Sequence, residues 1–517
     1  MDATMLNSYE QWRLARRDEH VRLCAAGGED RLSALPDDVL RLILRRLDTR
    51  SALATAALSS DVLPEGYHYY LRRRHDASGR RMRGSVVRKL DALIGRYERQ
   101  GMRCLASSVR SFLDADDGEA RRSGEAMSLE LFPTHNSGPF NQLIAAAVGE
   151  WGVENLEVTV LNPTPRRDAG YSFPHHCFED PTSPAGELKR LKLTKCAPLA
   201  ARDGGGAPPR AFASLAVLVL HGVPRSARGR VYQRVVRACP ALETLQLTSC
   251  LYRGDVSIDA PASRLAELVV DACPFRSLAL RALPRLQRLA CRCAPLVVTF
   301  GSVPRLAHLN LSFHDDDPSA RPGRFFPGVR DELNSVLDFQ SRAPGLESLA
   351  VRFTGPETWI MRGQAGLAGL RRLLLADMPR SWDALWACRL LQAARSLETL
   401  HVHVGDHDPE EGATTSGPAI PEPPLGFKHR ALREVAIVGF EGTGTQLQFA
   451  RFLVSTCRAL ESAALLKRGR VGDKGFWDWE VAVSQEEDQW SNEERELVSR
   501  EIQSGGVASS ALRIVLG

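Results

Sequence analysis

The stretch Leu242-Glu243-Thr244-Leu245-Gln246-Leu247 places leucine at its first, fourth and sixth positions. Leu245 and Leu247 are two residues apart, so in an extended strand their side chains lie on the same face. Thr244 and Gln246 then lie on the opposite face. The alternation predicts a short strand that is buried on one side only.

The same pattern recurs along the chain, with Val, Ile, Cys or Ala replacing some leucines. Most copies start about 20 to 28 residues apart, which is the spacing of leucine-rich repeats. Pro/Gly-rich or acidic insertions, such as 162–186 and 405–427, account for the longer spacings. The copies start at Val153, Leu188, Leu215, Leu242, Leu265, Leu286, Leu306, Leu346, Leu370, Leu397, Leu432 and, weakly, Leu460.

Several copies follow a helical pattern and a turn. Val231, Val235 and Val236 recur at helical spacing before the copy at Leu242, and a second pattern, 449–457, precedes the last copy. Helix, turn and strand in repetition stack into a solenoid with a parallel sheet on its concave side. The sequence therefore predicts an α/β leucine-rich-repeat solenoid, a horseshoe. The copies between Leu265 and Leu311 lack room for a full helix, so we expect irregular structure there.

The segment 30–60 carries a different pattern, two short amphipathic helices. Pro36 suits a first helical turn, and Asp37 and Asp38 favour the positive end of the helix dipole. Arg41, Arg45 and Arg46 take the polar side of this helix. The apolar side carries Leu40, Ile43, Leu44 and Leu47 at positions i, i+3, i+4 and i+7. Such a short segment buries its leucines poorly alone, so we expect it to dock on something.

This segment resembles the F-box of plant F-box proteins, through Asp30-Arg31-Leu32-Ser33, Leu35-Pro36-Asp37-Asp38-Val39-Leu40, Ile43-Leu44 and Leu47-Asp48-Thr49. The repeats after it resemble the leucine-rich-repeat region of the same proteins. The resemblance implies that a groove of a Skp-family adaptor binds Leu35, Pro36, Leu40, Ile43, Leu44 and Leu47. The segment departs from the family after Ser60, where Asp61-Val62-Leu63-Pro64 replaces the usual basic pair and tryptophan.

Five segments are predicted: an N-terminal extension (1–29), an all-helical F-box-like segment (30–66), a basic helical linker (67–150), the solenoid (151–470) and a C-terminal cap (471–517). In the cap, Ser491 and Glu494 form a capping box for a helix, and 512–516 forms a final strand. Trp477, Trp479 and Trp490 are expected to cover the open core of the last repeat.

Composition bounds the function. The hydrophobic share of 44% and the charged share of 25% are ordinary for a globular protein. We expect no membrane span and no secretion, because the sequence has no long apolar run and its first twenty residues are polar. The 11 cysteines show no disulfide framework, so we expect a reducing cytoplasmic or nuclear compartment, with most cysteines buried as small apolar groups.

The residues between the leucines predict a basic patch on the concave face. Arginine binds carboxylate and phosphate through paired hydrogen bonds, so the patch suits an acidic or phosphorylated peptide, or a small anionic ligand. A set of solvated arginines is the alternative interpretation. The candidate target-binding residues are Arg288, Arg292, His308, Arg352, Arg372, His401 and His403.

Other patterns favour ordinary structure over chemistry. The basic cluster 72–89 lacks interleaved aromatic residues, so a solvated face is favoured over nucleic-acid binding. His401 and His403 share a strand face, but no further ligand completes a metal site. Gly439, Gly442 and Gly444 lie between a strand and a helix without a full phosphate-binding motif, so a loop of the repeat explains them.

No enzyme signature is present, and no cofactor is expected. The resemblance implies the substrate-recognition subunit of an SCF-type ubiquitin ligase, joined through a Skp-family adaptor to a cullin scaffold. An unknown target protein binds the repeats in this interpretation. The alternative is a leucine-rich-repeat interaction scaffold or decoy that no longer joins a ligase, which the altered end of the F-box-like segment favours.

Overall fold

The computed structural model describes residues 125–131, 138–160, 171–174, 188–198, 212–313 (without 226 and 294–295), 345–352, 367–378, 388, 391–405, 427–483, 490–503 and 512–517, with a few helical residues between 99 and 111. The chain divides into two compact units, Met1–Tyr171 and Ser172–Gly517. The six residues of the predicted adaptor site, Leu35 to Leu47, lie outside the described part.

The first unit contains two parallel strands, β1 (Ala126–Leu131) and β2 (Asn155–Val160), and the helix α6 (Gly138–Gly149) between them in sequence. The helix lies in the segment 67–150, which was predicted to be a basic helical linker, and its residues Leu143, Ile144 and Val148 are buried. Strand β1 corrects that prediction, because it adds a strand to the same segment. Its alternating burial, with Met127, Leu129 and Leu131 inside, is a strand pattern that the linker assignment overlooked.

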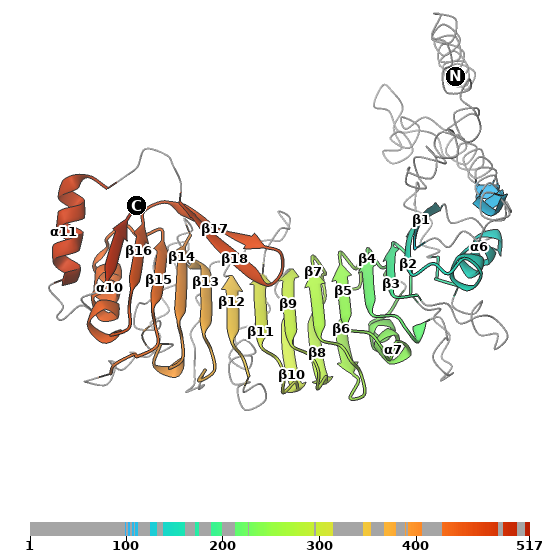
Figure 1. Ribbon diagram of the computed structural model, residues 1–517, viewed down its shortest axis with the longest axis horizontal. Coiled ribbons are helices and arrows are strands. Elements are labelled where there is room, and N and C mark those ends of the chain that lie inside the picture. Colours follow the sequence, from blue (N-terminus) through green and yellow to red (C-terminus); the bar gives the residue numbers. More distant parts are fainter. Residues whose placement is uncertain are drawn as a thin grey trace, which may run out of the picture. The chain divides into compact units, whose positions relative to one another are not determined.

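The second unit is built on a long parallel sheet, here called the main sheet (Figure 1). Each predicted copy of the repeat forms a strand that begins two residues after the first leucine of its motif, which confirms the repeat assignment. In spatial order the strands are β3 (Arg190–Thr194), β4 (Val217–His221), β5 (Thr244–Thr248), β7 (Glu267–Asp271), β9 (Arg288–Cys293), β11 (His308–Phe313), β12 (Ser348–Arg352), β13 (Arg372–Met378), β14 (Thr399–Val404), β15 (Glu434–Val438), β16 (Ser462–Leu466) and β19 (Arg513–Leu516).

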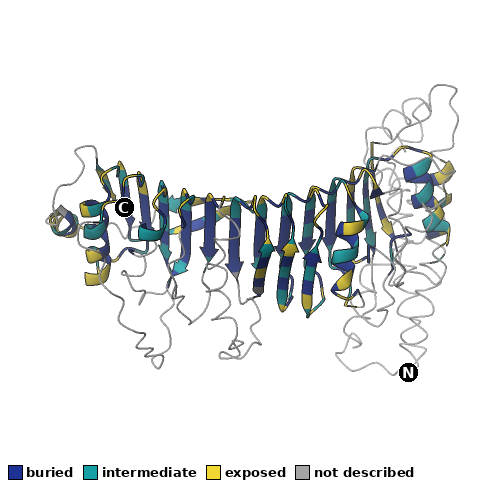
Figure 2. Cartoon of the chain, turned by 90° about the horizontal axis from the view of Figure 1, so that it is seen from below, coloured by how far each residue is buried: buried dark blue, intermediate teal, exposed yellow. Residues whose placement is uncertain are grey.

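The leucines of the motif form the core behind this sheet. Leu242, Leu245 and Leu247 are each 0% exposed, and neighbouring strands repeat the arrangement in register. Figure 2 shows the buried residues as dark blue bands along successive strands. Thr244 and Gln246 lie on the opposite face, as the alternation predicts. We call that opposite face, which the sequence predicts to be concave, the front face.

Helices cover the back of the core only in part. Helix α7 (Arg230–Ala238) and helix α10 (Gly444–Thr456) confirm the two predicted helical patterns. In the short repeats a second parallel sheet replaces the helices. It contains β6 (Asp255–Asp259), β8 (Ser277–Ala282) and β10 (Val297–Ser302) in the order β10-β8-β6. An extended segment covers more core per residue than a helix does, so it fits where the repeat is short.

Cysteines occupy repeated positions just beyond the strands. The Cys250 thiol lies 3.6 Å from the Leu220 carbonyl oxygen, and the Cys273 thiol lies 3.5 Å from that of Leu247, each on the preceding strand. Burial raises the pKa of the Cys239 thiol to about 12. The cysteines of the described part are all buried and form no disulfide with one another, as expected for small apolar groups. Among the described helices, none is long and apolar enough to cross a membrane.

Replacement of one core leucine should destabilise the solenoid strongly. Leu245→Ala removes a fully buried side chain and leaves a cavity, so we expect a loss of about 2–5 kcal/mol in the free energy of unfolding. Gln246→Ala, the next residue on the front face, is the matched control, with an expected change below about 1 kcal/mol. Urea denaturation followed by circular dichroism measures both. Equal shifts of the two variants would contradict the assigned faces.

Candidate functional site

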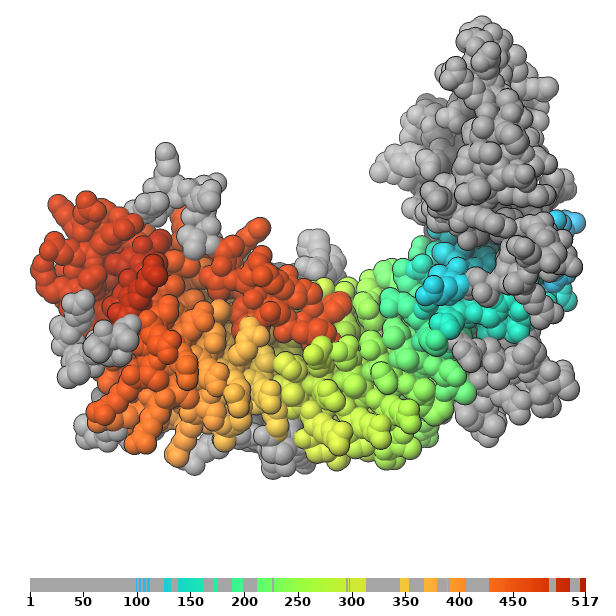
Figure 3. All heavy atoms as spheres, in the orientation of Figure 1, coloured from blue at the N-terminus to red at the C-terminus, as the bar shows by residue number. Residues whose placement is uncertain are grey.

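A β-hairpin from the C-terminal region lies across the front face of the main sheet. Its strands are β17 (Gly469–Lys474) and β18 (Asp478–Val483), paired antiparallel. Figure 1 shows the hairpin running in front of the middle strands, and in Figure 3 its red-orange atoms cover part of that face. The sequence prediction placed Trp477 and Trp479 over the end of the last repeat. The structure corrects this, because both tryptophans belong to the hairpin.

The alternation of the hairpin decides which of its residues meet the sheet. Val471 is paired with Val481, and Asp473 is paired with Trp479. Directly opposite residues of an antiparallel pair share a face, so these four side chains point the same way. Val471 and Trp479 are each only 6% exposed. The other face carries Lys474 and Glu480, which form a 3.0 Å ion pair in solvent.

The front face presents three rows of side chains to the hairpin. Parallel pairing aligns equivalent positions of successive strands. The register shifts between β13 and β14 after Leu375, so the third row is interrupted between Ala376 and His403. The first row holds Arg288, His308, Ser348, Arg372, Thr399 and Glu434; the middle row holds Ala290, Asn310, Ala350, Leu374, His401, Ala436 and Ala464; the third row holds Arg292, Ser312, Arg352, Ala376, His403, Val438 and Leu466. The predicted target-binding residues therefore do lie on one face, and the arginines flank a middle row of mostly small or apolar residues.

The apolar part of the hairpin packs over the middle and third rows, along a strip of the front face that we call the lane. Val471 and Trp479 belong to one buried cluster with residues of β12, β13, β15 and β16, and Val481 packs against it. Small side chains leave room there for the indole ring. The sheet residues of the cluster are Ala350, Leu374, Ala376, Val438, Leu466 and, at its margin, Ala464.

The first-row arginines engage the hairpin through charge and stacking. Arg372 Nη2 lies 2.7 Å from Asp478 Oδ1, and its guanidinium lies 4.5 Å from the centre of the Trp479 ring. Burial raises the pKa of Asp478, but the hydrogen bonds from Arg372 and from the Trp479 backbone N–H, together with the nearby positive charges, outweigh it and the pKa is lowered. Arg288 pairs with Glu267 at 3.0 Å and lies 5.8 Å from the Trp477 ring.

The third-row arginines share one hairpin carboxylate. Asp473 lies 3.5 Å from Arg292 Nη1 and 3.4 Å from Arg352 Nη2. Both arginines also have a partner on the sheet, Asp271 at 3.3 Å for Arg292 and Asp377 at 2.8 Å for Arg352. The Arg292 guanidinium lies 4.5 Å from the Phe476 ring centre. Each arginine of this row therefore has its own carboxylate on the sheet and shares a second, more distant one on the hairpin.

The middle row contributes a preorganised hydrogen-bond donor, Asn310. Its Nδ2 donates to the carbonyl oxygen of Phe476 at 2.9 Å, and its Oδ1 accepts from the Ser312 hydroxyl at 2.7 Å. Asn310 and Ser312 are both buried. Because the Ser312 hydroxyl holds the Asn310 side-chain amide in place, Nδ2 already points at the hairpin and loses little conformational entropy when it donates.

His401 and His403, predicted as binding residues, have different partners. His401 Nδ1 accepts from Trp479 Nε1–H at 2.8 Å, and its Nε2 lies 3.2 Å from Glu434 Oε1. Burial lowers the pKa of His401 despite the raising effect of Glu434. His403 Nδ1 lies 2.7 Å from Asp377 Oδ1. Burial raises the pKa of Asp377, but His403 and Arg352 outweigh it and the net shift is downward.

His308, the remaining predicted residue, is half-buried in the first row between Arg288 and Ser348. Burial, with help from Arg288, lowers its pKa below the ordinary histidine value. A neutral imidazole at this place does not add to the positive charge of the row. His308 therefore adds no positive charge to the basic patch near neutral pH, and its predicted role in target binding stays a prediction.

The partners on the hairpin were missed at the sequence level because 471–517 was assigned as a cap. Three residues that include Gly475, between two alternating segments, are a hairpin signal that could have been found. The docking position of the hairpin could not have been found from the sequence, because the contacting residues Arg292 and Gly475 are 183 positions apart. The site residues that the sequence did not predict are Asp473, Phe476 and Asp478. Trp477 and Trp479 were predicted, but at the end of the last repeat instead of in the hairpin.

The end of the solenoid is closed by other elements. Helix α11 (Asn492–Gln503) carries the predicted capping box, with the Ser491 N–H donating to Glu494 at 2.8 Å, and β19 is the predicted final strand. Trp490 Nε1 donates to the Gly517 carbonyl at 3.1 Å and its ring centre lies 6.1 Å from that of Phe440, so this tryptophan does sit at the last repeat.

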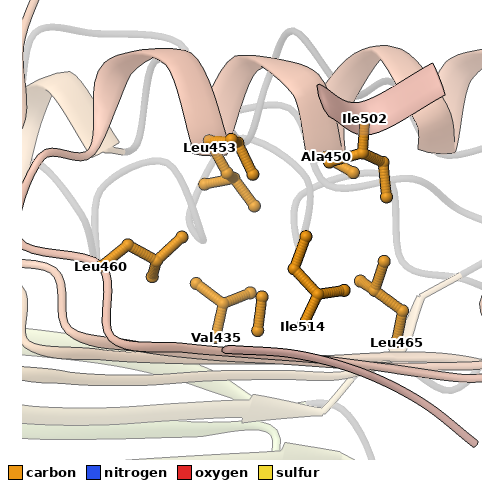
Figure 4. A pocket seen from close by; sticks show the side chains of 9 residues that line it. Val435, Ala450, Leu453, Leu460, Leu465, Ile502 and Ile514 are labelled. Carbon is orange, nitrogen blue, oxygen red and sulfur yellow. The ribbon is translucent and has the colours of Figure 1, made fainter. Parts of the chain in front are cut away.

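A small hollow lies between α10, α11 and the last strands (Figure 4). Its labelled side chains are all aliphatic, so it offers no polar group that orients a ligand. We interpret it as imperfect packing. The lining includes Val435, Ala450, Leu453, Leu460, Leu465, Ile502 and Ile514.

The glycine-rich loop after β15 is not a phosphate site. Oε1 of Gln446 accepts from the backbone N–H of Glu441 at 2.8 Å and of Gly442 at 3.0 Å. Thr443 caps α10 in a capping box with the same glutamine. The N–H groups that an anion needs are thus already bonded, which confirms the loop interpretation of this motif.

Among the residues that the structure describes, no group of three His, Cys, Asp or Glu side chains gathers as a metal site. His401 and His403 have the partners given above, and the acidic residues of 406–408 lie outside the described ranges. The basic cluster 72–89 also lies outside them.

Comparison with known proteins identifies the repeats. Residues 126–468 match the family model of the At1g61320/AtMIF1 leucine-rich-repeat domain, which is more than half of the chain. No curated protein matches the sequence.

The docking of the hairpin should depend on Trp479 more than on any single ion pair. Trp479→Ala removes a buried ring, a loss of about 3–5 kcal/mol that should undock the hairpin. Arg372→Ala removes a half-exposed ion pair and a stacking contact, worth about 1 kcal/mol, so amide exchange in β17 and β18 should rise about fivefold.

Hydrogen exchange with mass spectrometry measures both effects. Arg371→Ala is the matched control, because Arg371 pairs with Glu398 and not with the hairpin. An equal response to Arg371→Ala and Arg372→Ala would refute the docking contacts.

The hairpin should also loosen as the pH falls below about 6.5. In the docked state burial lowers the pKa of His401 below its ordinary value, and the neutral imidazole accepts a hydrogen bond from Trp479 at Nδ1. In the pH range between the lowered pKa of docked His401 and its ordinary pKa, the undocked state binds more protons than the docked state. Acidification across this pH range therefore favours undocking. The charged groups that face the imidazole are Glu434, Arg372 and Asp478, and the pKa of Asp478 is lowered below its ordinary value.

Amide exchange of the hairpin at pH 7 and pH 5, corrected for intrinsic rates, tests this. His401→Gln retains an acceptor but does not titrate, so its exchange should not change between the two pH values. A pH response that persists in His401→Gln would assign the effect to another group.

Proposed function

Because the chain belongs to the At1g61320/AtMIF1 leucine-rich-repeat family, we propose that it recognises target proteins as a subunit of an SCF-type ubiquitin ligase. A leucine-rich-repeat domain implies protein–protein interaction. The observation that supports target recognition is the front face, where flanking arginines and an apolar lane already bind a polypeptide segment of the same chain.

The ligase assignment rests on the order of the two sequence features. The segment 30–60, which resembles an F-box, precedes the repeats, as in plant F-box proteins with leucine-rich repeats. In this proposal Leu35, Pro36, Leu40, Ile43, Leu44 and Leu47 bind a Skp-family adaptor, which connects the chain to a cullin scaffold. The complex would act in the cytoplasm or nucleus.

The proposed mechanism is proximity. The repeats hold the target while the adaptor end fixes the chain to the scaffold, so target lysines stay near a charged ubiquitin carrier. Such tethering raises the effective concentration of the reacting groups. Catalysis belongs to other subunits in this proposal, and the chain needs no cofactor.

A second candidate is a repeat scaffold or decoy outside any ligase. The observation that favours it is the sequence after Ser60, where Asp61-Val62-Leu63-Pro64 stands in place of the usual basic pair and tryptophan. In this case the front face still binds proteins, but no adaptor binds the N-terminal segment.

Co-purification with a Skp-family adaptor distinguishes the two candidates. We expect the chain to bind the adaptor and the triple variant Leu35→Ala, Pro36→Ala, Leu40→Ala to lose at least tenfold in affinity, because buried apolar anchors dominate such interfaces. Arg45→Ala, on the polar side of the same helix, is the matched control and should bind as the native chain does. Absence of binding by the native chain would reject the ligase role and leave the scaffold.

A further inference from the structure

We propose that the lane of the front face between Arg288 and His403 is a binding site for an acidic, tryptophan-containing segment of a partner protein, and that the β17–β18 hairpin is its occupant in cis, which the partner displaces. The inference deepens the proposed target recognition and rests on it. It does not rest on the F-box assignment.

The first argument is that the lane recognises a polypeptide backbone. Three side chains donate to carbonyl oxygens of the hairpin: Asn310 to Phe476 at 2.9 Å, Arg352 to Val471 at 3.3 Å and Arg292 to Gly475 at 3.4 Å. Val471 belongs to β17, and Gly475 and Phe476 belong to the turn of the hairpin. Side-chain donors that bind main-chain carbonyls recognise a polypeptide. A site for phosphate or nucleic acid has no use for such spaced contacts.

The second argument is the pairing of charge with an aromatic ring. Asp478 and Trp479 are adjacent, and Arg372 contacts both, through a 2.7 Å ion pair and a 4.5 Å stacking contact. His401 adds an acceptor for the indole N–H. The lane therefore selects a carboxylate directly beside a tryptophan, with a second carboxylate for the third-row arginines.

The third argument is that the hairpin satisfies the third row incompletely. Asp473 reaches Arg292 and Arg352 only at 3.5 Å and 3.4 Å, which is longer than the 2.7–2.9 Å typical of charge-assisted hydrogen bonds. Arg352 is 12% exposed at its side chain, and its Nε has no hydrogen-bond partner among the described residues. A buried donor without a partner is costly, so a segment that supplies a better-placed carboxylate gains affinity over the hairpin.

The fourth argument is that the ion pairs of the hairpin are partly solvated. The side chains of Arg372 and Asp478 are 42% and 50% exposed, and the apolar anchor consists of Val471, Trp479 and Val481. Partly exposed pairs contribute little to stability. A hairpin held mainly by one ring and two valines can exchange with a competing segment.

The test uses the full chain and a peptide of its own hairpin. The probe is a fluorescent peptide of residues 469–483, closed by a disulfide between added terminal cysteines so that it is preorganised. Anisotropy measures its binding to the native chain and to Trp479→Ala, whose own hairpin should be undocked. We expect at least tenfold tighter binding to Trp479→Ala, because its lane is open.

Matched variants in the Trp479→Ala background locate the bound peptide. Added Arg372→Glu should weaken binding at least tenfold, whereas added Arg371→Glu should leave it unchanged. The overturning results are absence of binding to Trp479→Ala, or equal binding to the Arg372→Glu and Arg371→Glu variants. Stronger competition by a single-stranded oligonucleotide than by unlabelled peptide would also overturn the proposal, in favour of a nucleic-acid site.

Selection from a displayed library of random peptides on Trp479→Ala tests the class of partner. We expect enriched sequences to place Asp or Glu next to Trp or Phe, and enrichment of basic or purely aliphatic sequences would overturn the proposal. Adaptor co-purification of the same variants keeps the two proposals separate. Failure of adaptor binding rejects only the ligase role, and failure of the peptide test rejects only this inference.

Discussion

The structure depends on the two-residue period of its strands. Each strand of the main sheet buries leucines on one face, so the residues between them are exposed on the other. Parallel pairing in register then turns single positions of the sequence into rows across many strands. No repeat can bury its leucines alone, and stacking is what removes them from water. The rows on the front face are therefore a consequence of how the core is built.

The residue types at a few positions decide what the rows of the front face can bind. Small residues such as Ala350 and Ala376 leave space along the lane, while Arg292 and Arg372 supply charge at its margins. The Arg372–Asp478 pair is modest in energy because solvent reaches both side chains. The buried Trp479 ring and the fixed amide of Asn310 provide the larger and more directional contributions. Binding at this face thus depends on shape and backbone recognition first and on charge second.

Sequence patterns were sufficient for the fold of the second unit and for one side of its site. The L-x-x-L-x-L spacing located the strands, and the alternation placed Arg288, Arg352 and Arg372 on one face. Two predictions were wrong for local reasons. The strand β1 lies in a segment whose other patterns are helical, and the placement of Trp479 at the last repeat ignored the alternation of its neighbours. The docking of the hairpin has a different cause, since contact between residues 183 positions apart leaves no local signal.

The hairpin also changes how the repeats depend on one another. In a simple solenoid each repeat contacts only its neighbours, so stability is a sum of local terms. Here one hairpin contacts β9 through Arg292, β11 through Asn310 and β16 through Leu466. These repeats all contact the hairpin. Loss of order in one repeat therefore weakens the docking of the hairpin, and with it the contacts that stabilise the other repeats. Docking of the hairpin therefore couples the stabilities of repeats that are otherwise independent. A segment of another protein that displaces the hairpin would couple them less, because only the native hairpin is joined covalently to β16.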